Sequence, residues 1–290
     1  MTNSSSSLIG LPAPAKLNLF LHITGRRQDG YHTLETVFQL IDLGDSLDFE
    51  LTNNGQILLL DNSGIIPEKN LVVRAARALQ AEPRWAGQGI NIRLHKRIPL
   101  GGGLGGGSSN AATALLALNK LWQLELSADR LATIGLNLGA DVPFFLCGHN
   151  AWAQGIGEEL TPLTLPKRWF LLVYPGVSIS TQKIFAHPDL TRNTPRAIIS
   201  DFTQTWKLAG YFGRNDLQTV AARLESPVAI ALASVPNSRM TGSGACVFAA
   251  FPSLALAQQA KHSVKLPSGM LAWVVESLPE HPLHRYALFQ

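Results

Sequence analysis

Cysteine is scarce in this chain, and the placement of its two copies excludes whole classes of protein. Cys147 and Cys246 lie far apart, and neither stands in a Cys-x-x-Cys or histidine-rich context. A disulfide framework needs several paired cysteines, and a thiolate zinc site needs closely spaced ones. We therefore expect two free, buried thiols.

Charge and long apolar runs are also limited. Charged residues make up 15% of the chain, the net charge is +4, and no lysine and arginine run is dense enough to predict a nucleic-acid partner. No apolar stretch reaches the roughly 18 residues of a membrane span. The serine-rich Met1–Ser7 lacks the basic start and apolar core of a secretory signal. We expect a cytoplasmic globular protein that binds anionic small molecules and no membrane.

Glycine, in contrast, is concentrated in one run, Pro99–Asn110, which leads into the apolar stretch Ala111–Leu121. Glycine loses much conformational freedom on folding, so such a run indicates a backbone that approaches a ligand or takes positive φ. The preceding Ile90–Ile98 alternates as a half-buried strand does, and Ser108 to Asn110 are expected to cap the following helix. The order strand, glycine loop, helix N-terminus suits a phosphate group.

Two familiar phosphate motifs fit this run poorly. Three of its glycines satisfy G-x-G-x-x-G, but no later strand carries the acidic residue that a dinucleotide fold places near the ribose. Gly102 and Gly107 have the Walker spacing, yet Ser108 occupies the lysine position. The loop is therefore predicted to bind phosphate through its backbone, without a P-loop lysine.

Four polar side chains are candidates for the chemistry. Lys16 and Asn18 are two apart on a predicted strand, so they face the same way and could reach one ligand. Lys96 interrupts an apolar face just before the glycine run, which favours a polar cavity. Asp141 lies among apolar residues and needs a partner, for which Lys16 is a candidate. Alternatively, Lys16 and Asn18 lie on an ordinary solvated strand face, and Asp141 only caps a helix or forms a turn.

Strands and helices are mixed without regular alternation, which predicts an α+β fold in two lobes. We expect a disordered tail over residues 1–10, an N-terminal lobe over 11–163 and a C-terminal lobe over 164–290. Phe144–Cys147 is expected to be extended or buried. Strands are predicted over residues 15–23, 33–41, 47–51, 57–60, 169–174, 245–251 and 271–276. Helices are predicted over residues 70–80, 111–121 and 254–262, with another between Ser127 and Gly139.

A family resemblance now emerges from several separate motifs. Three of them, in order, resemble those of the GHMP small-molecule kinases: Pro14–Asn18, Pro99–Ser109 and Thr241–Gly244. Three more are similar to the 4-diphosphocytidyl-2-C-methyl-D-erythritol kinase branch of that family: Gly30–Leu34, Gly139–Pro143 and Pro282–Arg285. The resemblance covers nearly the whole chain.

The resemblance implies a two-lobed GHMP architecture with the active site in the cleft between lobes. It also implies a reaction in which ATP, with Mg²⁺, phosphorylates the 2-hydroxyl of 4-diphosphocytidyl-2-C-methyl-D-erythritol in the non-mevalonate route to isoprenoids. Asp141 would accept the hydroxyl proton and Lys16 would steady both groups. Asn18 would orient the acceptor. The family positions that hold the cytosine ring correspond to Tyr31, His32 and Phe185.

The implied ATP site is larger. Its residues are Lys96, Pro99, Leu100, Gly101, Gly102, Gly103, Leu104, Gly105, Gly106, Gly107, Ser108 and Ser109. No acidic cluster marks metal ligands, so Mg²⁺ is expected to be held by phosphates, water and Ser108. The expected assembly is a monomer or a weak homodimer.

Three other functions remain open at this point. A mevalonate- or homoserine-type kinase would share the glycine loop but would not need the pair Tyr31 and His32. A non-catalytic nucleotide-binding regulator would not need Lys16 and Asp141 together. A dinucleotide oxidoreductase would bind NAD.

Overall fold

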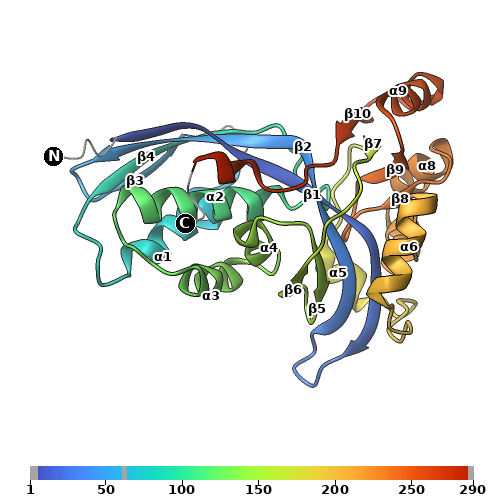
Figure 1. Ribbon diagram of the computed structural model, residues 1–290, viewed down its shortest axis with the longest axis horizontal. Helices are drawn as coiled ribbons and strands as arrows, with labels where there is room; N and C mark the ends of the chain where they lie inside the picture. Colours follow the sequence, from blue (N-terminus) through green and yellow to red (C-terminus); the bar gives the residue numbers. More distant parts are fainter. Residues whose placement is uncertain (1–5, 61–63, 287–290) are drawn as a thin grey trace.

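Two long antiparallel strands, β1 and β2, form the centre of the first lobe (Figure 1). The structure is a computed structural model, and it describes residues 6–60 and 64–286. The sheet runs in the order β3-β4-β2-β5-β6, and β1 pairs with β2. Its strands are β1 (Ser7–Arg26), β2 (His32–Thr52), β3 (Ile57–Leu60), β4 (Gly89–His95), β5 (Ala151–Gln154) and β6 (Glu159–Pro162).

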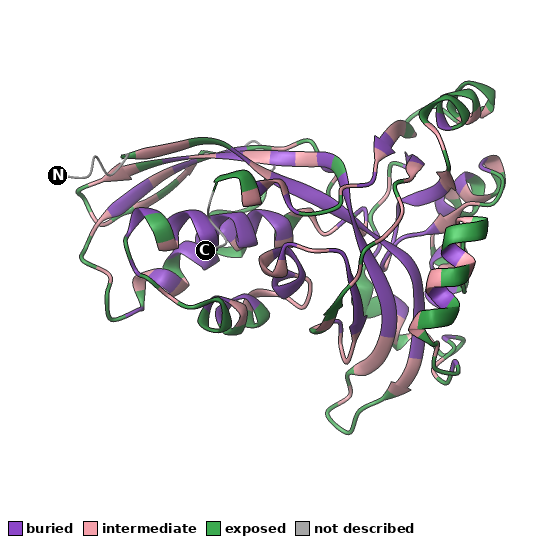
Figure 2. Ribbon diagram, in the orientation of Figure 1, coloured by how far each residue is buried: buried purple, intermediate pink, exposed green. Residues whose placement is uncertain are grey.

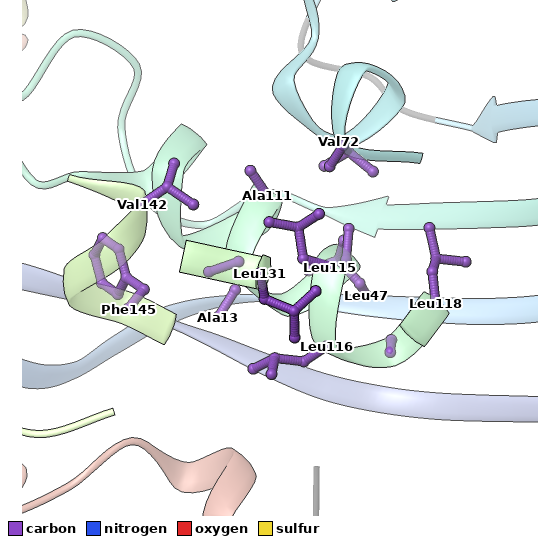
Figure 3. Packing of buried hydrophobic residues seen from close by; sticks show 14 of the residues in the cluster. Ala13, Leu47, Val72, Ala111, Leu115, Leu116, Leu118, Leu131, Val142 and Phe145 are labelled. Carbon is purple, nitrogen blue, oxygen red and sulfur yellow. The ribbon is translucent and has the colours of Figure 1, made fainter. Parts of the chain in front are cut away.

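Helices cover one face of this sheet. They are the 3-10 helix η1 (Pro67–Lys69), α1 (Leu71–Gln80), α2 (Gly106–Leu121), α3 (Ala128–Leu138) and α4 (Val142–Cys147). The central helix α2 is apolar on nearly all sides, and such a helix is stable only when it is surrounded. Its alanines and leucines pack against α1, α3, α4 and the strands (Figure 3). The N-terminus of α2 is therefore held firmly.

The second lobe has a smaller antiparallel sheet in the order β10-β7-β9-β8. Its strands are β7 (Trp169–Tyr174), β8 (Arg239–Met240), β9 (Val247–Phe251) and β10 (Leu271–Glu276). Its helices are α5 (Thr181–Ala186), α6 (Ile199–Ala209), α7 (Gln218–Leu224), α8 (Ser226–Ser234) and α9 (Leu254–Ser263), and the 3-10 helix η2 (Pro282–Tyr286) returns to the first lobe. The predicted α+β, two-lobed fold is confirmed.

A continuous apolar cluster joins the lobes. Phe20 of β1 and Trp152 of β5 contact Phe202 of α6, and all three are almost completely buried. Figure 2 shows β1 buried along most of its length, including where it runs beside the second lobe. Because both faces of β1 are covered, its polar side chains are drawn into the interior.

Several local expectations are confirmed and others are wrong. Asn70 and Ser127 accept hydrogen bonds from backbone amides at the first turns of α1 and α3, where those helices were predicted. The predicted tail is wrong for residues 7–10, because β1 begins at Ser7, which pairs with Glu50 of β2. Residues 1–5 lie outside the described part of the chain.

Two further corrections concern helices near the glycine run. Helix α2 begins at Gly106 with Gly105 at its N-cap, so Ser108, Ser109 and Asn110 lie inside the helix and do not cap it. The segment from Phe144 to Cys147 is buried in part, as predicted, but forms the end of α4 and is not extended. In the first case the left-handed φ of Gly105 starts the helix one turn earlier than the serines suggested.

The predicted lobe boundary between residues 163 and 164 falls between β6 and β7. It stays a prediction, because β1 contributes to the apolar cluster of both lobes. Among the described residues, no helix has both the length and the apolar character needed to cross a membrane.

Candidate active site

The glycine loop owes its shape to residues with positive φ. Gly103 has φ +74°, and a Cβ there would lie 2.4 Å from the carbonyl oxygen of Thr241. Gly105 has φ +72°, and a Cβ there would meet the ring of Phe145 at 3.0 Å. Any larger residue at these positions would be strained and would displace its neighbours. The loop ends at the N-terminus of α2, where backbone N–H groups lack helical partners and attract anions.

A second glycine turn, between β8 and β9, is joined to the first. Ala245 N donates to the Gly101 carbonyl and Cys246 N donates to the Gly102 carbonyl, each at 3.1 Å. The hydroxyl of Thr241 accepts a hydrogen bond from Asn18 N at 2.8 Å. The two turns, far apart in sequence, therefore form one backbone surface beside the middle of β1.

Lys16 and Asp141 form an ion pair beside this surface. The Lys16 Nζ lies 3.3 Å from Asp141 Oδ2, and the lysine side chain is 4% exposed while the aspartate is 32% exposed. Lys16 also donates to Asn18 Oδ1 and lies 5.0 Å above the ring of Phe38. Asp141 occupies the N-cap of α4 but makes no side-chain capping bond. Its carboxylate lines a cavity, and the Lys16 ammonium group is held against it.

The larger cavity, of about 840 Å³, extends from this pair to a group of aromatic residues. Tyr31, His32 and Phe185 line it together with Lys16, Asn18 and Asp141. The rings of His32 and Phe185 are stacked with centroids 5.0 Å apart. Tyr31 is 62% exposed at the mouth of the cavity. A charged pair at one end and an aromatic platform at the other suit an elongated substrate with an aromatic base.

Arg192, which sequence reasoning missed, holds His32 in place. Its Nε donates to His32 Nε2 at 3.1 Å, and its other nitrogens donate to the carbonyls of Phe185 and His187. Burial, followed by the positive charges of Arg192 and Arg26, lowers the pKa of His32 below its usual range. Arg192 lies 160 residues from His32, and no motif in the sequence links them.

A smaller cavity of about 260 Å³ adjoins the first. Its lining includes most of the predicted ATP residues: Lys96, Pro99, Leu100, Gly101, Gly102, Gly103, Leu104, Gly105, Gly106, Gly107 and Ser108. Ser109 is the exception, because it is completely buried and lines neither cavity. Gly103, Gly105 and Ser108 line both cavities, so the glycine loop lies between them.

Asp45 is a second residue that sequence reasoning missed. Its buried carboxylate accepts hydrogen bonds from Arg97 N at 2.7 Å and Ile98 N at 2.8 Å, and it forms an ion pair with Lys96. Asp45 thereby connects β2 to the segment that leads into the glycine loop. Lys96 lies on the small cavity, as its position in the sequence suggested, but with its charge paired.

Replacing Asp45 by asparagine should destabilise the protein. The variant Asp45→Asn leaves Lys96 without its carboxylate, and breaking a buried ion pair typically costs about 3 kcal/mol of unfolding free energy or more. Urea denaturation measures this loss, and the KM for ATP should rise because the loop is less well held. Asp48→Asn on the same strand, whose carboxylate faces His95 at the surface, is the control and should lose about 1 kcal/mol at most. Equal losses in the two variants would contradict this role of Asp45.

Comparisons with known proteins agree with the geometry. The family models "GHMP kinases N terminal domain" and "GHMP kinases C terminal" match residues 70–149 and 197–267. The chain is 51% identical to a 4-diphosphocytidyl-2-C-methyl-D-erythritol kinase from Ralstonia nicotianae, over 99% of this chain and 100% of that protein.

Two solved structures resemble this chain to different degrees. A crystal structure of 4-(cytidine 5'-diphospho)-2C-methyl-D-erythritol kinase is 33% identical, with a TM-score of 0.76 over 92% of this chain and 98% of that one. A homoserine kinase from Cytophaga hutchinsonii has a TM-score of 0.64 over 97% of both chains, but at 18% identity it shows only the fold. The chain belongs to the GHMP kinase family and, within it, to the 4-diphosphocytidyl-2-C-methyl-D-erythritol kinases.

Proposed function

We propose that this ATP-dependent kinase transfers the γ-phosphoryl group of ATP to the 2-hydroxyl of 4-diphosphocytidyl-2-C-methyl-D-erythritol, a step in the non-mevalonate route to isoprenoid precursors. The observation that carries the proposal is the Lys16–Asp141 pair, which lies between the glycine loop and an aromatic platform in one cavity. Mevalonate and homoserine have no nucleobase ring that could stack on that platform. The two rings of the platform suit a cytosine.

The residues of the pair have separate roles in this proposal. Asp141 accepts the proton of the acceptor hydroxyl as its oxygen attacks phosphorus. Lys16, held by Asn18 and the ring of Phe38, keeps the carboxylate in position. Phosphoryl transfer depends chiefly on positioning and on electrostatic stabilisation. Backbone N–H groups of the glycine loop then supply the stabilisation for which a P-loop uses a lysine.

The same residues fit a magnesium ion. Mg²⁺ prefers oxygen ligands and keeps several waters, so it needs few protein ligands. The Ser108 hydroxyl is an oxygen donor that lines the cavity beside the loop, and phosphates and water would supply the other ligands. When bound there with ATP, the ion would neutralise charge on the phosphates.

A panel of acceptors tests this proposal. Initial rates with ATP and Mg²⁺ should be measured with 4-diphosphocytidyl-2-C-methyl-D-erythritol, mevalonate and homoserine. We expect the cytidine compound to have a kcat/KM at least about a hundredfold above the others, since loss of base stacking and of its hydrogen bonds each costs one or more kcal/mol. Comparable rates with mevalonate or homoserine would overturn the assignment of the acceptor.

Acid should weaken binding of the cytidine substrate through His32. Its pKa lies below the ordinary value of about 6.5, so the neutral ring accepts the Arg192 hydrogen bond throughout the neutral range. Protonation of the ring below pH 6.5 breaks that bond and places a cation beside Arg192. The KM for the substrate should therefore be constant from pH 8 to about 6.5 and rise below it, whereas the KM for ATP should not follow this course.

The variant His32→Gln provides the control, because its amide oxygen also accepts from Arg192 but does not titrate. Its KM for the cytidine substrate should not rise in acid. A rise in KM that survives in His32→Gln would assign the titration to another group.

Acid should also lower the free energy of unfolding of the wild type. The unfolded chain takes up this proton at a higher pH than the folded chain, so stability falls as the pH drops below about 6.5.

A further inference from the structure

A cluster of metal-binding side chains lies outside both cavities. His149, Glu280 and His284 each offer one ligand atom, and these three atoms lie within 4.8 Å of one another. The rings of His149 and His284 face each other with centroids 5.0 Å apart and an angle of 36° between their planes. His284 belongs to the Pro282–Arg285 motif of the sequence, which the proposed reaction does not use.

Two backbone segments hold these residues together. His149, which follows α4, forms an antiparallel bridge with Glu280, and His281 N donates to the Gly148 carbonyl at 2.8 Å. The Asn150 side chain donates to the carbonyls of Leu278 and Pro279 at 2.9 and 3.2 Å. Figure 1 shows the C-terminal segment returning from β10 across the first lobe to η2. The ligands are thus positioned by hydrogen bonds on both sides before any ion binds.

We propose that His149, Glu280 and His284 form a binding site for a divalent transition-metal ion of the zinc type. Two imidazoles and one carboxylate, with a fourth position left to water, are a ligand set that zinc favours. Ligand atoms around a tetrahedral ion lie about 2.0–2.2 Å from it and so about 3.4 Å from one another. A pair at the 4.8 Å limit must therefore close by roughly 1.4 Å. The Glu280 side chain is exposed, so its rotation can bring the carboxylate closer to the two imidazoles.

The site differs in chemistry from the one expected for the nucleotide metal. Mg²⁺ selects oxygen ligands, whereas this cluster supplies two nitrogens. An ion here would tie the C-terminal segment to the end of α4, the helix whose first residue follows Asp141. The bound ion would therefore stabilise the packing of the C-terminal segment against the residues that follow α4. It would take no part in phosphoryl transfer.

Titration of the full chain with ZnCl₂ tests the site. Affinity is measured by competition with a fluorescent zinc chelator, and melting temperature is followed with and without the ion. The wild type should bind one equivalent, and saturating Zn²⁺ should raise its Tm. His149→Gln, Glu280→Gln and His284→Gln should each weaken binding at least about tenfold, because loss of a ligand costs more than loss of an outer partner. Millimolar Mg²⁺ should not displace the ion.

His262→Gln is the matched control, since it removes an exposed histidine of α9 and should bind Zn²⁺ as the wild type does. If a histidine variant folds poorly, Glu280→Gln still tests the site, because Glu280 is exposed and its replacement should not disturb the fold. The proposal is overturned if the wild type shows no saturable Zn²⁺ binding, or if any of the three ligand variants binds with wild-type affinity.

Discussion

Turnover by Asp141→Asn should fall at least about a hundredfold while ATP affinity stays within about twofold of the wild type. The asparagine keeps the size of the side chain at the N-cap of α4 but cannot accept the proton of the acceptor hydroxyl. It also leaves Lys16 facing an uncharged amide at 3.3 Å. A general base typically contributes about 10²- to 10⁴-fold. In the proposed arrangement ATP binds in the smaller cavity, which Asp141 does not line. Steady-state kinetics and a nucleotide titration separate the two effects.

Asp129→Asn is the control for this experiment, because Asp129 is an exposed residue in the first turn of α3. Its turnover should be that of the wild type. Near-normal turnover by Asp141→Asn would contradict the assignment of Asp141 as the base. A loss of ATP affinity as large as the loss of turnover would show that the carboxylate acts on the donor instead.

Gly103→Ala should raise the KM for ATP at least about tenfold. The added Cβ would lie 2.4 Å from the Thr241 carbonyl oxygen and 2.9 Å from that of Gly244, and φ is +74°. A left-handed conformation also costs an ordinary residue roughly 1–2 kcal/mol, which adds to the clash and favours a shift of the loop away from its native conformation. The loop must move to relieve the contact, and its backbone N–H groups then no longer converge on the phosphates.

Gly269→Ala is the control, because it introduces the same backbone strain without a clash of the added Cβ. Gly269 has φ +88°, but a Cβ there meets nothing within 4 Å. This variant should lose some stability and keep its KM for ATP. If Gly103→Ala also keeps that KM, the glycine loop does not bind the nucleotide in the way proposed here.

Local rules predicted much of the fold and part of the site. The alternation of β4 and the density of glycines placed a phosphate loop between a strand and a helix, because a strand and a glycine turn are encoded by neighbouring residues. Lys16 and Asn18 share a face of β1 for the same reason, as residues two apart on a strand do. The helices capped by Asn70 and Ser127 also depend on local bonds.

Contacts between distant segments could not be predicted in this way. The carboxylate of Asp45 reaches Lys96 only because β2 pairs with β4, and Arg192 reaches His32 across 160 residues. Such pairings depend on tertiary packing, which no periodicity of the sequence reports. The same holds for the bridge between His149 and Glu280, which brings the C-terminal segment onto the first lobe.

A crystal structure of the complex with a non-hydrolysable ATP analogue and 4-diphosphocytidyl-2-C-methyl-D-erythritol would show whether Asp141 meets the acceptor hydroxyl. We expect the cytosine ring beside Phe185 and His32, the γ-phosphate against the N-terminus of α2, and the 2-hydroxyl within about 3 Å of the Asp141 carboxylate. A complex in which the 2-hydroxyl lies away from Asp141 and Lys16, with the base elsewhere than the aromatic platform, would contradict the proposed function.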